Sequence, residues 1–152
     1  MVKKEIYTEK QSSALIIILF SAFIIFMTMA FIYGWGDNPI TLPVYLVMVP
    51  IMLLPMVMFY NMRTVVDQKY IYIIYGAGFI RKVMPLKDIS DVAVTKVPWY
   101  NGAGIKYTRR GKLYSINFTS AVWLKVRAGQ AVMIGSKNPE LLAGEIRKRI
   151  GG

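Results

Sequence analysis

Two long uncharged apolar stretches constrain this chain more than any other feature of its sequence. Residues 13–33 and 40–60 each continue for about 21 residues without a charged side chain, enough for a helix to cross the roughly 30 Å hydrocarbon core of a bilayer. The segment between them, residues 34–39, is rich in glycine and also holds an asparagine and a proline, which favours a turn. We therefore expect a two-helix transmembrane hairpin over residues 13–60.

The orientation of this hairpin follows from the basic residues that flank it. Lys3, Lys4 and Lys10 precede the first stretch and Arg63 and Lys69 follow the second, whereas the connecting turn has no basic residue. Because basic residues stay on the cytoplasmic side, we expect a multi-pass protein of the cell (plasma) membrane with both termini in the cytoplasm. A cleaved signal peptide is the competing interpretation of the first stretch, but the stretch is too long and has no A-x-A site.

The positive charge of the chain is concentrated after the hairpin. Residues 63–152 contain sixteen lysines and arginines against five acidic residues, so this segment carries the whole net charge of +11. Such a segment is attracted to anionic surfaces, and beside a membrane the nearest one is the cytoplasmic leaflet. Nucleic acid is the other candidate, but a membrane tether argues against it, and we expect no nucleic-acid partner.

The absence of two residue types limits the kinds of catalytic and metal-binding site that this chain can form. The chain has no cysteine and no histidine, which removes disulfides, thiolate metal sites, the commonest zinc ligands and most hydrolase triads. The basic segment has too few carboxylates for a converging acid–base site, and Gly102-Ala103-Gly104 lacks the rest of a nucleotide-binding motif. We expect neither an enzyme nor a cofactor or metal site.

After residue 62 the pattern changes to short runs of β-branched and aromatic residues with polar interruptions, which is typical of antiparallel strands. Glycines at 76, 78, 111 and 129 suit hairpin turns, so consecutive strands should pair as a meander. In residues 121–127, alternation places Val122, Leu124 and Val126 on one face, which we expect to be core. The predicted strands cover residues 63–66, 69–75, 79–83, 89–96, 104–108, 112–118, 121–127 and 130–134.

The last segment, residues 138–151, has the signals of an amphipathic helix. Asn138 suits the cap and Pro139 the first turn. An apolar stripe then recurs every four residues at Leu142, Ile146 and Ile150. We expect this helix to pack on the sheet through that stripe.

Four short motifs carry a resemblance to a known family: L-x-D-I at residues 86–89, a Trp- and Gly-rich link before G-I-K-Y at 99–107, A-V-x-L-x-V at 121–126, and I-G-S-x-x-P-E-x-L at 134–142. Together they resemble the bacterial PH-domain (pleckstrin-homology-like) membrane proteins. The resemblance implies a mainly β PH-like barrel of two packed antiparallel sheets with one C-terminal helix, behind two transmembrane helices. The expected layout is a cytoplasmic tail (1–12), the hairpin (13–60) and a cytoplasmic PH-like domain (61–152).

PH-like folds bind phosphoinositides, peptides or proteins, so the fold alone does not fix the function. Our first hypothesis is a membrane-anchored adaptor that recognises a protein or peptide partner through a strand edge or the groove beside the last helix. The alternatives are a module that binds anionic phospholipid headgroups and a homo-oligomeric scaffold assembled through the hairpin. The candidate lipid- or partner-binding residues are Arg81, Lys82, Trp99, Tyr100, Arg109, Arg110 and Lys112.

Overall fold

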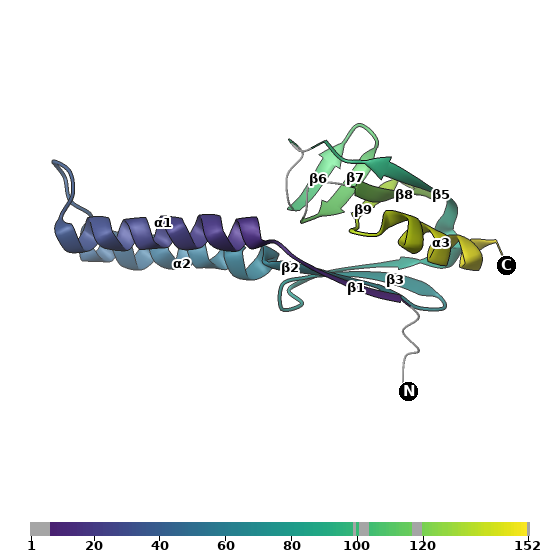
Figure 1. Ribbon diagram of the computed structural model, residues 1–152, viewed down its shortest axis with the longest axis horizontal. Coiled ribbons are helices and arrows are strands. Elements are labelled where there is room, and N and C mark those ends of the chain that lie inside the picture. Colours follow the sequence, from purple (N-terminus) through teal and green to yellow (C-terminus); the bar gives the residue numbers. More distant parts are fainter. Residues whose placement is uncertain (1–6, 99, 101–103, 117–119, 152) are drawn as a thin grey trace.

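The computed structural model of the chain describes residues 7–98, 100, 104–116 and 120–151. A pair of long antiparallel helices forms a rod at one end, and a β-rich domain forms the other (Figure 1). The first strand leads directly into the first helix, and the second strand follows directly after the second helix. These two strands pair with each other, so two neighbouring chain segments join the rod to the domain (Figure 1).

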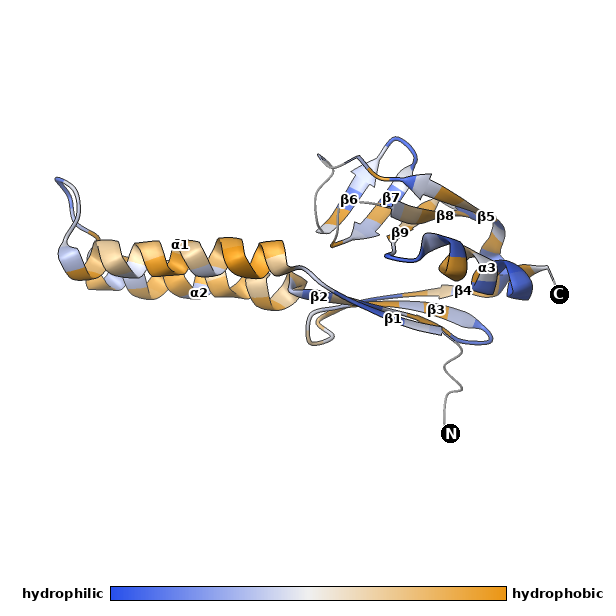
Figure 2. Cartoon of the chain, in the orientation of Figure 1, coloured by the Kyte–Doolittle hydropathy of each residue, from blue (hydrophilic) through white to orange (hydrophobic). Residues whose placement is uncertain are grey.

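The rod consists of α1 (Ala14–Tyr33) and α2 (Leu42–Phe59). Both helices lie within the stretches expected from the sequence, and both are long and apolar enough to cross a membrane. Their large side chains are mostly exposed, and hydrophobic colouring covers the rod along its length (Figure 2). An apolar surface of this kind is stable in lipid and unfavourable in water.

Two polar contacts join the helices to each other. The Thr28 and Tyr45 hydroxyls lie 2.9 Å apart, and the Tyr45 ring also stacks on Phe31 with 4.7 Å between ring centroids. Nearer the β domain, the Ser21 hydroxyl lies 4.0 Å from the Met56 sulfur. Small polar side chains at a helix–helix interface are typical of helices that pack in apolar surroundings.

The first sheet is the antiparallel meander expected from the sequence, with one strand more than predicted. Its strands follow each other in chain order: β1 (Tyr7–Ser12), β2 (Asn61–Val66), β3 (Tyr70–Tyr75) and β4 (Ile80–Pro85). Sequence analysis placed residues 7–12 in the N-terminal tail. Instead these residues pair along their whole length with β2, from Tyr7 opposite Val66 to Ser12 opposite Asn61.

The second sheet differs from the expected meander. It contains β5 (Ile89–Lys96), β6 (Gly104–Thr108), β7 (Gly111–Ser115), β8 (Ser120–Val126) and β9 (Val132–Gly135), in the spatial order β5-β8-β9-β7-β6. Consecutive antiparallel pairing is confirmed for β6–β7 and for β8–β9. It was wrong for the rest of the sheet, because β9 lies between β7 and β8 and runs parallel to β7, and β5 pairs with β8. All four residues of β9 are buried, which suits a central strand covered on both faces.

The C-terminal helix α3 (Pro139–Ile150) confirms the predicted apolar stripe. Leu142 and Ile146 are fully buried and Ile150 is half-buried. The helix packs against β5, β8 and the short 3-10 turn η1 (Leu86–Asp88), and its stripe joins both sheets in one core. Asn138 occupies the cap position, but its side chain makes no capping hydrogen bond.

The two sheets pack through this core without joining into one closed barrel among the described residues. Strand β4 forms one edge of the first sheet, and β5 and β6 form the edges of the second. The alternation predicted for β8 is confirmed, because Val122 and Leu124 are fully buried whereas Lys125 is exposed. Strand β4 is thus an edge strand whose outer side is unpaired in the described chain.

Candidate ligand-binding cleft

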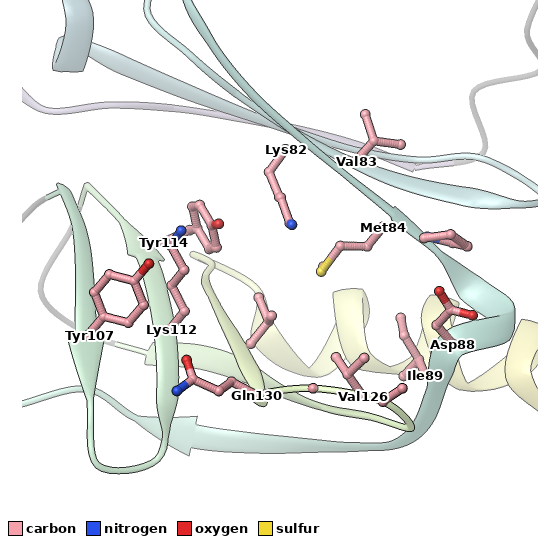
Figure 3. Close-up of a pocket in the computed structure, with 14 residues that line it drawn as sticks. Lys82, Val83, Met84, Asp88, Ile89, Tyr107, Lys112, Tyr114, Val126 and Gln130 are labelled. Atoms are coloured by element: carbon pink, nitrogen blue, oxygen red, sulfur yellow. The ribbon is translucent and has the colours of Figure 1, made fainter.

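A cleft of about 360 Å³ opens between strand β4 and the second sheet. Residues of β4 form one wall, β6 and β7 form the opposite wall, and the β8–β9 turn with the start of β5 closes the base (Figure 3). Met84, Ile89, Val126 and Val132 supply apolar surface inside it. The cleft thus combines a hydrophobic base with polar groups at the rim, as small binding sites do.

The cleft exists because the chain turns sharply after β4. Pro85 ends the strand, the 3-10 turn of residues 86–88 follows at once, and β5 begins at Ile89 in the other sheet. Leu86 and Ile89 are buried at this corner, so it is held in the core. The sheets therefore stay together at the corner, and the cleft lies beside it, between β4 and β7.

Lys112 occupies the wall opposite β4. It lies directly across from Tyr107 in the β6–β7 ladder, and its Nζ atom is 5.0 Å from the centre of the Tyr107 ring and 5.4 Å from that of Tyr114. Hydrogen bonding to the Tyr114 hydroxyl and then to that of Tyr107 raises the pKa of the Lys112 ammonium. The two aromatic rings therefore stabilise the positive charge of Lys112 at the rim of the cleft.

Lys82 supplies a second positive charge from the facing wall. Its side chain and that of Met84 point from β4 into the opening (Figure 3). In the part of the chain that the structure describes, neither Lys82 nor Lys112 forms an ion pair. Asp88 lines the cleft near its base, so the positive groups lie toward the mouth (Figure 3).

The free edge of β4 adds backbone hydrogen-bonding groups to this cleft. The Leu86 N–H donates to the Lys69 carbonyl at 2.8 Å, and hydrogen-bonded pairs alternate along an antiparallel ladder. Arg81 and Val83 are therefore in non-hydrogen-bonded pairs, and their N–H and C=O groups point away from β3. Pro85 holds the same kind of position, where its missing N–H costs no ladder bond.

The structure separates the basic residues that sequence analysis grouped together. Lys82 and Lys112 line the cleft, whereas Arg81 is exposed on the outer face of the first sheet. Arg109 and Arg110 lie at the β6–β7 tip, beside Trp123 on the outer face of the second sheet. They therefore do not form one site with Lys112.

Arg110 is held in place by its neighbours. Its guanidinium donates to the Thr95 hydroxyl at 3.3 Å, and its carbonyl accepts from the Trp123 indole at 3.1 Å. These contacts give it a structural role on the outer face of the sheet. Tyr100 is 70% exposed, and Trp99 lies outside the described residues.

Sequence analysis missed Tyr107 and Tyr114, which hold Lys112. The hairpin itself was predicted, and a two-residue turn at 109–110 places Tyr107 opposite Lys112, so register could have shown this pair. The contribution of β4 depends on pairing between distant segments and has no local signal. Among the described residues, no three acidic side chains gather into a group that could hold a metal ion.

Comparison of the chain with models of known protein families finds no match. Comparison with the curated proteins finds no match either. The site is therefore interpreted from its own geometry.

Proposed function

We propose that the protein is a membrane-anchored binding module whose cleft takes an acidic peptide segment in extended conformation. One observation carries the proposal: the free edge of β4 borders a cleft whose rim holds Lys82 and Lys112, with no ion pair to either within the described chain. Unpaired strand edges recruit further strands unless they are protected. The lysines select for an acidic partner.

The proposed mode of recognition is addition of a strand to β4. Backbone groups of the peptide bond to those of Arg81 and Val83, which provides affinity that does not depend on sequence. Alternate peptide side chains then face the cleft, where an acidic group lies near Lys112 and an apolar group covers Met84. This mode supports the adaptor hypothesis and involves no catalysis.

The remaining features support the anchoring and the fold class. Helices of 20 and 18 uncharged residues, almost without burial, are consistent with two passes through a membrane, both ends being cytoplasmic by the positive-inside rule. The β domain consists of a four-stranded sheet, a five-stranded sheet and a C-terminal helix that joins both sheets in one core. This arrangement supports a PH-like fold with an open side.

Peptide binding can be tested with the full chain in phosphatidylcholine nanodiscs. The probes are two fluorescent peptides of alternating valine and glutamate or valine and lysine, and the measurement is fluorescence anisotropy. The acidic peptide should bind in a salt-sensitive manner and the basic one should not. Lys112→Met should weaken binding about tenfold, because it removes one charge-assisted contact of about 1.4 kcal/mol.

Two matched variants sharpen this test. Val83→Pro removes an N–H that faces the free edge, so it should abolish binding without breaking a β3–β4 ladder bond. Lys125→Met removes an equal charge from an exposed position of β8 outside the cleft and should leave binding unchanged. Equal effects of Lys112→Met and Lys125→Met, or binding that survives Val83→Pro, would refute recognition at the cleft.

The orientation has a separate test, because the chain has no native cysteine. Single cysteines can replace Asp37 in the helix connection and Lys137 before α3. In intact cells, a membrane-impermeant maleimide should label the cysteine at 37 but reach the cysteine at 137 only after lysis. Labelling of both, or of 137 alone, would overturn the proposed topology.

A further inference from the structure

Three cations from distant parts of the chain form a row across the outer face of the first sheet. In the strand register, Lys10 of β1 lies opposite Arg63 of β2, Arg63 lies opposite Ile74 of β3, and Ile74 lies opposite Arg81 of β4. All three cations are exposed. At about 4.8 Å between strands, the row is about 14 Å long and crosses the whole sheet.

Lys10 and Arg63 are as close as two residues on paired strands can be. The Ser13 N–H donates to the Tyr60 carbonyl at 3.0 Å, and the alternation along the ladder makes Lys10 and Arg63 a non-hydrogen-bonded pair. In such a pair the side chains approach most closely, and like charges directly opposite destabilise a sheet. Within the described residues, no acidic side chain neutralises Lys10, Arg63 or Arg81.

The row lies close to the ends of the long helices. Lys10 is three residues before Ser13, where α1 is capped, and Arg63 is three residues after Tyr60, where α2 ends. Three strand residues span about 10 Å, and long basic side chains can reach back over that distance toward an interface. If α1 and α2 cross a bilayer, the row therefore lies within reach of its headgroup layer.

A second feature at the same level of the molecule also suits a membrane interface. The β3–β4 turn is tied to the end of α2, because the Gly76 N–H donates to the Asn61 carbonyl at 2.9 Å. Phe79, the last residue of this turn before β4, is 71% exposed, and residues 76–79 carry no charge. An exposed aromatic ring beside the end of a membrane helix is placed to enter the boundary between headgroups and acyl chains.

We infer that Lys10, Arg63 and Arg81 form a binding site for the phosphate groups of anionic phospholipids, with Phe79 as an adjacent aromatic anchor. This inference rests on the proposed membrane anchoring but not on peptide binding in the cleft. The anions relieve the repulsion between Lys10 and Arg63, so lipid binding stabilises the first sheet and holds the domain in one orientation against the bilayer. The site lies on the face of the first sheet opposite the cleft, which leaves the cleft accessible.

The test compares the full chain in nanodiscs of phosphatidylcholine alone and of phosphatidylcholine with phosphatidylglycerol. The anionic lipid should raise the Tm of the domain by about 5 °C or more, and high salt should reduce this shift. The triple variant K10Q/R63Q/R81Q should lose most of the shift. The control K87Q/K96Q/K125Q removes the same charge from exposed residues on η1, β5 and β8 and should keep it.

Three results would overturn the site. An equal loss of the shift in both triple variants would mean diffuse attraction by net charge, and no shift in the native chain would mean no anionic-lipid binding. A shift of equal size from inorganic phosphate, added to phosphatidylcholine nanodiscs, would indicate a site for soluble anions. Peptide binding measured on K10Q/R63Q separates the two proposals, because these two residues lie on β1 and β2, away from the β4 edge, and peptide binding should be retained where the lipid effect is reduced.

Discussion

The Glu9 carboxylate accepts a hydrogen bond of 2.6 Å from the Ser136 hydroxyl, which is 127 positions away in the chain. It also accepts from the Lys137 backbone N–H at 2.6 Å and from the Tyr7 hydroxyl at 2.9 Å. Glu9 is buried, and three donors in place of a cation satisfy its charge. The strand that leads into α1 is thereby fixed to the segment that leads into α3.

Replacing Glu9 with alanine should therefore destabilise the β domain strongly. The substitution leaves the Lys137 N–H and the Ser136 hydroxyl without their acceptor, at a cost of about 2–3 kcal/mol in the free energy of unfolding. Chemical denaturation of the full chain in mild detergent measures this loss. Glu140→Ala, at an exposed position of α3, should cost less than about 1 kcal/mol, and equal losses would contradict the role of Glu9.

The same residue explains why sequence analysis missed β1. The inward-facing positions of this strand hold Glu9 and Gln11, both buried, so the apolar alternation that marks a half-buried strand is absent. The Gln11 side chain donates to the Gly135 carbonyl at 2.8 Å, another contact between distant segments. By contrast, β5 and β6 begin and end at the predicted residues, since their signals are local.

Sequence analysis predicted single residues of the candidate site but not which of them lie together. Lys112 was chosen together with Arg109 and Arg110 because all three were expected at one hairpin tip, where side chains are free to bind. Strand geometry then separates them: Lys112 faces the cleft, whereas Arg110 bonds to Thr95 on the outer face. The insertion of β9 beside β7, which no local pattern indicates, builds the base of the cleft.

Gly76 lies in close contact with the backbone of α2. A Cβ atom there would lie 2.5 Å from the Val57 carbonyl oxygen and 2.7 Å from that of Met58, and the φ angle is +57°. Gly76→Ala should therefore cost about 3 kcal/mol or more. Gly78→Ala, with φ +103° but open space around it, should cost about 1–2 kcal/mol from backbone strain alone.

Thermal unfolding of both glycine variants in the same detergent checks this difference. An equal loss of stability would show that the close approach of the turn to α2 is unimportant. A clearly larger loss from Gly76→Ala than from Gly78→Ala would instead show that this approach couples the helices to the sheet.

The raised pKa of Tyr7 allows a prediction of how the stability of the protein changes at alkaline pH. Burial, and then the hydrogen bond to Glu9 and its negative charge, raise the pKa of Tyr7 from 10.0 to about 12. The folded chain thus keeps a proton that the unfolded chain releases, so this stabilisation is complete below pH 10 and is lost as the pH rises to about 12. Tyr7→Phe has no hydroxyl to ionise, and its Tm should fall less steeply across this window. Parallel Tm curves for the native chain and the variant would contradict the prediction.

Thr64 offers a substitution that should stabilise the protein. Its side chain is fully buried, and its hydroxyl has no hydrogen-bond partner among the described residues. Valine has the same shape without the polar group, so Thr64→Val should raise the free energy of unfolding by about 1 kcal/mol. Thr108→Val is the matched control, because the Thr108 hydroxyl donates to the Gly111 carbonyl at 2.8 Å and accepts from the Arg110 N–H at 3.2 Å. That variant should lose about 1 kcal/mol in the free energy of unfolding.

The measurement for both variants is the denaturant midpoint of unfolding. Midpoints that move in opposite directions support both assignments, whereas a loss from Thr64→Val would mean that its hydroxyl is hydrogen-bonded in solution.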